Sequence, residues 1–243
     1  MKIDDAFQDQ ILGDIRSDAF KIAVRFINYE VVPGDICEFG CYTGRSLAML
    51  AYHQEKYWEA ENAHNSENVI KRRVFGLDSF SGLAASEAHP RWNKGLFGTN
   101  HSYHPTIPYG ANVAPEKIYE FFSFYKLPKP ILKSGYFNTM TRDDLAGIEK
   151  IAILHIDCDL YSSTKDVFKL VGDKLVPGSI ILFDDWYHFK ADPRKGERLA
   201  FDEFRDENKH IQCEEFLRYG TFCKAFVVTE ISSDRTPPSH PGE

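Results

Sequence analysis

Four carboxylates lie just beyond two apolar segments of the chain. Asp157 and Asp159 follow the run over 151–156, and Asp184 and Asp185 follow the next apolar run. In a parallel sheet the carboxyl ends of neighbouring strands lie side by side, and ligands bind in the crevice outside them. Acids gathered there repel one another unless a cation is present, and hard oxygen ligands suit Mg²⁺. The pattern therefore predicts a Mg²⁺ site at this edge of the sheet.

Individual members of this group have simpler interpretations as well. Asp159 or Ser162 could cap the helix that is predicted to follow them. His188 comes shortly after the second acid pair and could orient or deprotonate a substrate. A single histidine can equally be packed or solvated, so both interpretations of His188 stay open.

A second group of residues surrounds two glycines. Gly40 and Gly44 lie where an apolar run gives way to a helical pattern. Such a turn lets a ligand approach the backbone and points helix N-terminal N–H groups at it. Asp78 ends the next predicted strand, where doubly wound enzymes place the carboxylate that binds ribose hydroxyls. These residues predict a nucleoside cofactor site, unless the glycines only shape a turn and Asp78 only caps a loop.

Alternating strands and helices would position both groups. Unbroken apolar runs separated by helical patterns are typical of a parallel sheet covered on both faces. We therefore predict an α/β fold with a doubly wound, mostly parallel sheet that ends in an antiparallel hairpin. Strands are predicted over 36–39, 74–77, 131–132, 151–156, 179–183, 211–217 and 222–229. Helices are predicted from a cap at Ser17, and over 44–58, 115–125, 162–175 and 193–208.

The length of 243 residues suits one domain, which we expect over 1–231 with an N-terminal helical segment over 1–31. The stretch 84–114 lacks periodicity and is longer than an ordinary connection, so we predict a lid or binding loop there. Residues 232–243 are polar and rich in proline and predict a mobile tail.

Composition excludes several classes of partner. A net charge of −7 argues against nucleic acid, because such binding needs clustered basic residues. No apolar run approaches the roughly 20 residues that span a membrane. The N-terminal segment lacks the basic region and the apolar region of a secretory signal. A cytoplasmic protein is expected. The five cysteines are scattered, so we predict buried structural thiols rather than disulfides, and Cys37 and Cys41 lack the second pair that a zinc site needs.

Other functions could use part of this pattern. Asp157-Cys158-Asp159 could be the D-x-D motif of a glycosyltransferase that holds a nucleotide sugar through a metal, but the glycine turn would then have no role. A nicotinamide oxidoreductase would use the turn and Asp78, yet the glycine spacing is wrong for it and the acid cluster is not needed. A cofactor-binding protein without catalytic activity is a further alternative.

Four segments together resemble the macrocin O-methyltransferase family, which contains metal-dependent sugar O-methyltransferases of antibiotic biosynthesis. They are Val32-Pro33-Gly34-Asp35 leading into Glu38-Phe39-Gly40, Gly76 to Leu83, His155 to Thr164, and Pro177-Gly178 to Asp184-Asp185. The resemblance covers roughly 32–208. It implies a Rossmann-like class I methyltransferase fold with a seven-stranded sheet, and the cofactors S-adenosylmethionine and Mg²⁺.

The resemblance also implies roles for individual residues. Asp157, Asp184 and Asp185 would ligate Mg²⁺, and Asp159 would be the general base, with His188 as the second candidate. The acceptor would be a hydroxyl of a small molecule, with a sugar of a glycosylated natural product or of a polysaccharide expected first. The family also suggests a homo-oligomer. The implied cofactor-binding residues are Glu38, Gly40, Tyr42, Thr43, Gly44, Arg45, Ser46, Asp78, Ser79, Gly135, Tyr136, Phe137 and Asp157.

One position departs from the family pattern, which usually has glycine where this chain has Cys158. We expect acceptor recognition in the predicted lid and in the stretch 186–198.

Overall fold

The computed structural model describes residues 7–62, 70–84 and 91–232. Seven strands form one sheet in the order β3-β2-β1-β4-β5-β7-β6. The first five pair in parallel, and β7 lies antiparallel between β5 and β6. The predicted fold class is thus confirmed. The strands are β1 (Asp35–Phe39), β2 (Val74–Asp78), β3 (Ile131–Ser134), β4 (Ile151–Ile156), β5 (Leu175–Phe183), β6 (Ile211–Tyr219) and β7 (Cys223–Ile231).

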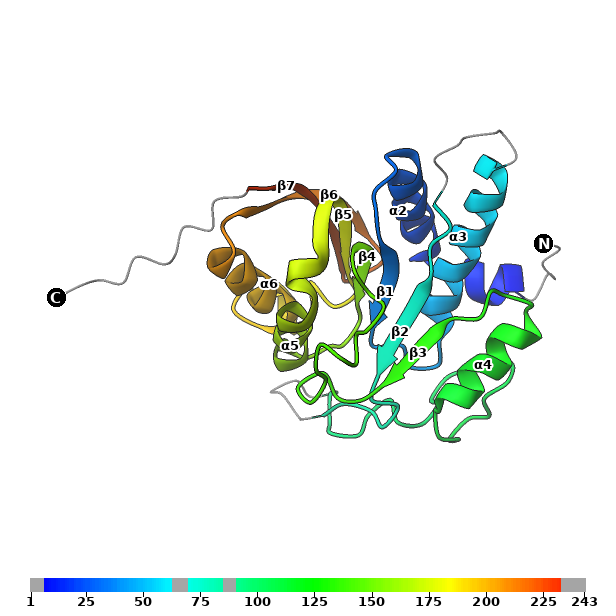
Figure 1. Cartoon of the computed structure of the whole chain (residues 1–243). Helices are drawn as coiled ribbons and strands as arrows, with labels where there is room; N and C mark the ends of the chain where they lie inside the picture. Colours follow the sequence, from blue (N-terminus) through cyan, green and yellow to red (C-terminus); the bar gives the residue numbers. More distant parts are fainter. Residues whose placement is uncertain (1–6, 63–69, 85–90, 233–243) are drawn as a thin grey trace.

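Helices cover both faces of the sheet, with α2 and α3 on one side and α5 and α6 on the other (Figure 1). Each face has its own apolar core, because the central strands β1 and β4 are buried along their whole length. No helix in the described ranges is long and apolar enough to cross a membrane. The helices are α2 (Ser17–Tyr29), α3 (Arg45–Asn62), α4 (Pro115–Phe124), α5 (Tyr161–Val171) and α6 (Gly196–Glu207), with short helical turns at Gln8–Leu12, Gly172–Lys174 and Phe189–Ala191.

The predicted cap of α2 is wrong. Arg16 is the N-cap residue, and Ser17 is the first residue of the helix. The Ser17 hydroxyl instead lies 3.0 Å from Nε2 of His53 on α3, so it links two helices. The start of this helix is therefore fixed by a contact to α3 that local sequence does not reveal.

Helix α5 also differs from its prediction at both ends. Its N-cap residue is Leu160, and no side chain caps it, so neither Asp159 nor Ser162 has that role. The helix ends at Val171 rather than at Leu175, because Leu175 already pairs with Ile151 in the sheet.

Gly40 follows β1 at a point where the backbone just after β4 leaves no room for a side chain. Its φ is +91°, and a Cβ atom there would overlap the backbone carbonyl oxygen of Asp157. We expect Gly40→Ala to lower the free energy of unfolding by at least about 3 kcal/mol, since both the strained φ and the overlap must be relieved. Gly95→Ala is the matched control, because Gly95 has φ +82° but open space around its Cβ position. Urea denaturation measures both, and equal losses would contradict the packing argument.

The described part of the predicted lid, residues 91–114, is held to α4 by a buried histidine. Nδ1 of His104 accepts N–H groups of Thr106 and Ile107 at 3.3 and 3.1 Å. The ring packs against Phe121, with centroids 4.4 Å apart. Burial, aided by the positive charge of Arg45, lowers the pKa of His104 from 6.5 to about 4. Protonation would remove the acceptor that the two N–H groups need.

This geometry gives the loop a pH dependence. When the loop opens, His104 regains its ordinary pKa, so the open form binds the proton more readily and the closed form loses stability as the pH falls from about 6.5 to about 4. We expect proteolysis within residues 91–114 to accelerate over this interval, after normalisation to an unfolded peptide at each pH. His104→Asn keeps an acceptor but cannot titrate, so its cleavage rate should stay flat there. An unchanged slope in that variant would show that another group controls the opening.

Candidate active site

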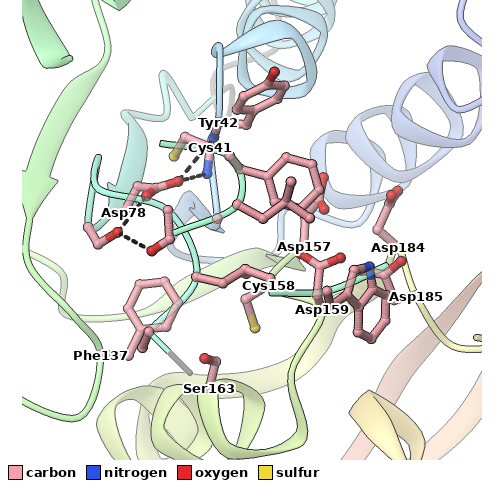
Figure 2. Close-up of a pocket in the computed structure, with 18 of the residues that line it drawn as sticks. Cys41, Tyr42, Asp78, Phe137, Asp157, Cys158, Asp159, Ser163, Asp184 and Asp185 are labelled. Carbon is pink, nitrogen blue, oxygen red and sulfur yellow. Dashed lines mark hydrogen bonds between the residues drawn. The ribbon is translucent and has the colours of Figure 1, made fainter. Parts of the chain in front are cut away.

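A cavity of about 890 Å³ opens at the carboxyl ends of the parallel strands. Loops that follow β1, β2, β3, β4 and β5 form its walls, and Figure 2 shows Asp78 and the Cys41–Tyr42 turn on one side and the strand-end acids on the other. A crevice at this edge is where doubly wound sheets bind ligands, and its volume lies within the range of small-molecule sites.

Most residues predicted for the site face this cavity. Glu38 and Gly44 are not part of its wall. Glu38 is fully buried behind it, and Gly44 has a φ of +81° and packs closely against Ile118 of α4. The predicted residues that do line the cavity are Gly40, Tyr42, Thr43, Arg45, Ser46, Asp78, Ser79, Gly135, Tyr136, Phe137, Asp157, Asp159, Asp184, Asp185 and His188.

Asp78 organises the turn after β1. Its Oδ2 accepts the backbone N–H groups of Cys41 and Tyr42 at 2.7 and 3.0 Å, and its Oδ1 accepts that of Phe80 at 2.8 Å. The carboxylate thus caps loops, as one sequence interpretation allowed. The Ser79 hydroxyl adds a fourth, longer contact to Oδ1 at 3.5 Å. The four contacts match the roughly four lone-pair positions of a carboxylate, and Asp78 also lines the cavity.

Asp157, Asp184 and Asp185 lie together opposite this turn. One carboxylate oxygen from each lies within 4.8 Å of the other two. Burial and the charge of Asp184 raise the pKa of Asp157 well above its usual value, and burial also raises the pKa of Asp185. Asp185 Oδ2 is buried and has no hydrogen-bond partner within the described residues. The cluster thus combines repulsion with unused acceptor capacity, which is the electrostatic setting of a cation site.

A cation of the protein itself lies against this cluster. Arg16 Nη1 donates to Asp184 Oδ1 at 3.0 Å and to Asp157 Oδ2 at 3.4 Å, while its Nε and Nη2 donate to Asp14. Sequence reasoning missed Arg16, because it is 141 residues away from Asp157 and belongs to no motif. The guanidinium marks a position where the fold stabilises positive charge.

Glu197 is a second residue that sequence reasoning missed. It is fully buried at the start of α6, and its Oε2 accepts the backbone N–H of Asp185 at 3.0 Å. Burial and the nearby Asp185 raise its pKa well above the usual value. Glu197 therefore fixes the backbone that carries Asp185.

The two predicted base candidates differ in their surroundings. Asp159 is nearly buried and has a φ of +61°, a region that non-glycine residues seldom adopt. His188 Nε2 lies 3.0 Å from Asp185 Oδ1, and its ring packs against Trp92 and Phe222. His188 is therefore held by the acid cluster, whereas Asp159 reaches the cavity from a strained backbone.

Strain of this kind recurs in the next segment. Phe189, Lys190 and Ala191 all have φ between 54° and 60° and form a short left-handed turn directly after His188. Such conformations cost about 1–3 kcal/mol each and concentrate at functional sites. These three residues belong to the stretch 186–198, which is predicted to recognise the acceptor. The surrounding structure must hold their backbone in this conformation.

The cysteines agree with the sequence prediction. All five are free thiols, and only Cys213 is not fully buried. The sulfur of Cys158 lies 3.5 Å from the Thr164 hydroxyl oxygen. Neither potential metal cluster found within residues 7–62, 70–84 and 91–232 contains a cysteine.

The family model described as macrocin O-methyltransferase (TylF) matches residues 6–215. This chain belongs to the macrocin O-methyltransferase family. The match confirms the resemblance found in the four sequence segments.

One curated relative is similar to most of this chain. A curated protein of Streptomyces olivaceus, 8-demethyl-8-(2,3-dimethoxy-alpha-L-rhamnosyl)-tetracenomycin-C 4'-O-methyltransferase, is 27% identical over 184 residues. These residues are 72% of this chain but only 62% of the relative's length.

Solved structures share the fold. The O-methyltransferase NovP superposes with a TM-score of 0.65 at 23% identity, covering 88% of this chain and 80% of that one. TomG from Streptomyces achromogenes, solved in complex with SAM, superposes with a TM-score of 0.52 at 12% identity, covering 94% and 91%. At these identities the likeness concerns the fold alone.

Proposed function

We propose that this protein transfers a methyl group from S-adenosylmethionine to a hydroxyl group of a small molecule, in a reaction that depends on Mg²⁺. The observation that carries the proposal is one cavity in which the Asp78-capped turn faces the cluster of Asp157, Asp184 and Asp185. A sugar is the proposed acceptor, in line with the rhamnosyl group named for the curated relative.

The donor set fits a hard divalent cation. Asp157, Asp184 and Asp185 offer only oxygen ligands, which Mg²⁺ prefers. Arg16 already contacts two of them, so the fold accommodates positive charge there. When bound, S-adenosylmethionine supplies an activated methyl group, and a divalent cation lowers the pKa of the acceptor hydroxyl.

The residues of the chain then bind the cofactor, orient the acceptor and remove the proton of its hydroxyl group. Asp159 takes the proton of the acceptor hydroxyl, with His188 as the second candidate. Asp78 and the turn around Gly40 hold the ribose and methionine parts of the cofactor, and Gly135, Tyr136 and Phe137 form its adenine side. The loop over 84–114 serves as the lid, in a single domain over 1–231. Family membership supports these roles together with the positions of the residues on the cavity wall.

Calorimetric titration tests the proposal. S-adenosylmethionine, S-adenosylhomocysteine, NAD⁺ and UDP-glucose are titrated into the purified protein, each with Mg²⁺ and with a chelator. We expect binding of the first two only. Binding of UDP-glucose that requires Mg²⁺, without binding of either methionine derivative, would favour the glycosyltransferase alternative based on Asp157-Cys158-Asp159.

Arg16 should compete with the metal. Because its guanidinium uses oxygens of Asp157 and Asp184, Mg²⁺ must displace or outcompete it. Hydrogen bonds to charged groups contribute about 1.5–3 kcal/mol, so we expect Arg16→Gln to bind Mg²⁺ about 10- to 100-fold more tightly. Titration of Mg²⁺ measures this, with Arg142→Gln as the control, since Arg142 pairs with Asp173 away from the cavity. Weaker Mg²⁺ binding by Arg16→Gln would show that Arg16 supports the site instead.

A further inference from the structure

Tyr42 belongs to the turn after β1, but its side chain leaves that turn and contacts the loop 91–114. Its hydroxyl oxygen accepts the backbone N–H of His101 at 2.6 Å. The hydroxyl proton is within reach of the Thr99 carbonyl oxygen at 3.2 Å and of Asn100 Oδ1 at 3.4 Å. One side chain of the proposed cofactor site is thus joined to the proposed lid by hydrogen bonds.

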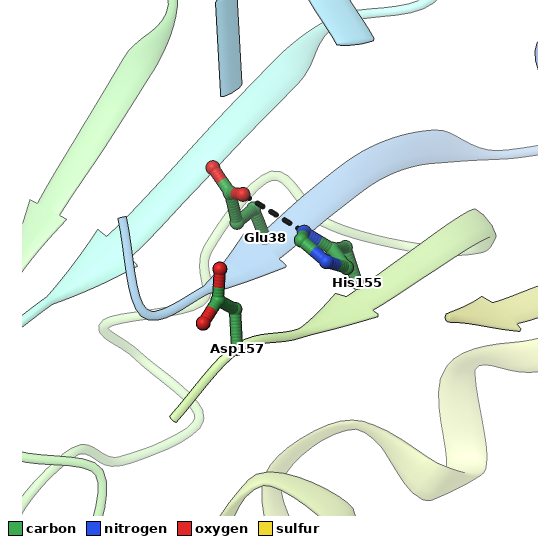
Figure 3. Close-up of side chains that lie close together, drawn as sticks. All are labelled: Glu38, His155 and Asp157. Atoms are coloured by element: carbon green, nitrogen blue, oxygen red, sulfur yellow. Dashed lines mark hydrogen bonds and ion pairs between the residues drawn. The ribbon is translucent and has the colours of Figure 1, made fainter. Parts of the chain in front are cut away.

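The turn that carries Tyr42 is anchored by the two strands that flank β1. On one side, Glu38 Oε1 lies 2.8 Å from His155 Nδ1 of β4, and both side chains are fully buried (Figure 3). On the other side, Asp78 at the end of β2 accepts the backbone N–H groups of Cys41 and Tyr42. The turn therefore has little freedom to move, and the loop is the mobile partner of the contact.

The same contact brings together two residues with unfavourable backbone conformations. Tyr42 has a φ of +44° and Phe97 has a φ of +70°, a region that non-glycine residues seldom adopt. Their rings meet edge to face, with centroids 5.2 Å apart. Strain of this kind persists only where the surrounding structure imposes it, and it concentrates at functional sites. The fold therefore maintains this ring contact at a cost.

The loop extends from Tyr42 to the segment beside the acid cluster. Backbone hydrogen bonds join its two halves, so it forms one connected unit. Near its start, Trp92 packs against the rings of His188 and Phe189, with centroids 4.9 and 5.0 Å away. The loop residues on the cavity wall include Trp92, Leu96, Phe97 and Ser102. The position of the loop therefore sets the shape of the wall near His188.

We propose that Tyr42 is a positioning residue for the acceptor side of the cavity: its hydroxyl fixes the loop where Trp92 packs against His188. The inference rests on the proposed function, which distinguishes the cofactor side from the acceptor side. The proton and a lone pair of the hydroxyl are used by the loop, so the cofactor does not depend on them. Loop position and cofactor affinity are therefore separable in a single variant.

Tyr42→Phe in the full chain removes the hydroxyl and leaves the ring to pack against Phe97. Two hydrogen bonds are lost, so we expect amide hydrogen exchange within residues 92–101 to accelerate about 5- to 100-fold. The indole N–H signal of Trp92 in the NMR spectrum should shift as well, because its packing against His188 depends on the loop. The chain has three tryptophans, and Trp92→Phe identifies this signal.

Tyr109→Phe is the matched control. It removes the same hydroxyl group from the same loop, at a side chain that is 77% exposed. Neither the exchange rate nor the Trp92 signal should change in this variant. An unmoved Trp92 signal in Tyr42→Phe would overturn the positioning role, and so would equal changes in both variants.

The affinity for S-adenosylhomocysteine, measured by calorimetry, separates this inference from the proposed function. We expect the same affinity in Tyr42→Phe and in the unchanged protein. A loss of affinity with an unmoved Trp92 signal would assign the hydroxyl to the cofactor instead and overturn the inference. If neither protein binds S-adenosylhomocysteine, the proposed function fails, and the exchange and NMR readings of the ligand-free protein still decide whether Tyr42 positions the loop.

Discussion

Asp159→Asn is expected to lower methyl transfer by about 100- to 10,000-fold, the usual contribution of a positioned general base. Asparagine has the same shape as aspartate but cannot accept a proton at neutral pH. It also tolerates a positive φ better than most residues, so the backbone at φ +61° should be retained. The loss would therefore report the proton transfer rather than a change of structure.

Two measurements make this expectation specific. Affinity for S-adenosylmethionine should be unchanged in Asp159→Asn, because the residues proposed to hold the ribose, methionine and adenine parts of the cofactor lie on the loops after β1, β2 and β3. His188→Gln should lose less activity, since His188 is already engaged with Asp185 at 3.0 Å. If Asp159→Asn keeps most of its turnover while His188→Gln does not, the base is His188.

Asp184→Asn is expected to lower Mg²⁺ affinity by at least about 100-fold and activity with it. Asp184 contacts Arg16, and one of its oxygens lies within 4.8 Å of oxygens of Asp157 and Asp185. Removal of a supporting residue alone can cost 10- to 100-fold in metal affinity, so loss of a charged ligand should cost no less. Activity should fall in parallel, since the acceptor hydroxyl would lose the group that lowers its pKa.

The matched control for this variant is Asp192→Asn. It removes one negative charge from an aspartate that pairs with Arg194 and lies outside the cavity wall. Its Mg²⁺ affinity should equal that of the unchanged protein. Normal Mg²⁺ affinity in Asp184→Asn would exclude this residue from the metal site, and high added Mg²⁺ that restores its activity would show that only affinity was lost.

Sequence reasoning succeeded where burial alone decides the structure. β4 was predicted with both ends correct, because a strand that is buried on both faces is an uninterrupted apolar run. β3 was predicted too short, since it lies at the sheet edge, and its last residues, Lys133 and Ser134, pair with β2 despite their polarity. The end of α5 was misplaced for a similar reason, because Leu175 pairs with Ile151 of β4 in the sheet.

The same contrast between local sequence patterns and contacts of distant segments applies to the candidate site. Acids at strand ends could be grouped from sequence, because parallel strands bring their carboxyl ends together. Arg16, Glu197 and the pairing of Glu38 with His155 could not, since each depends on a contact between distant segments. No local pattern of residues records such contacts.

The order of the loops along the chain has a consequence for how relatives of this protein diverge. The turn after β1, Asp78 and the segment after β3 all precede residue 150, whereas the acid cluster, Asp159 and His188 all follow it. A single recombination event in the gene, between the codons for β3 and β4, would exchange the half that carries the acids and leave the turn and Asp78 untouched. The proposed metal ligands and the proposed base can in this way be inherited as one block of coding sequence, while the loop over 84–114 stays with the other half.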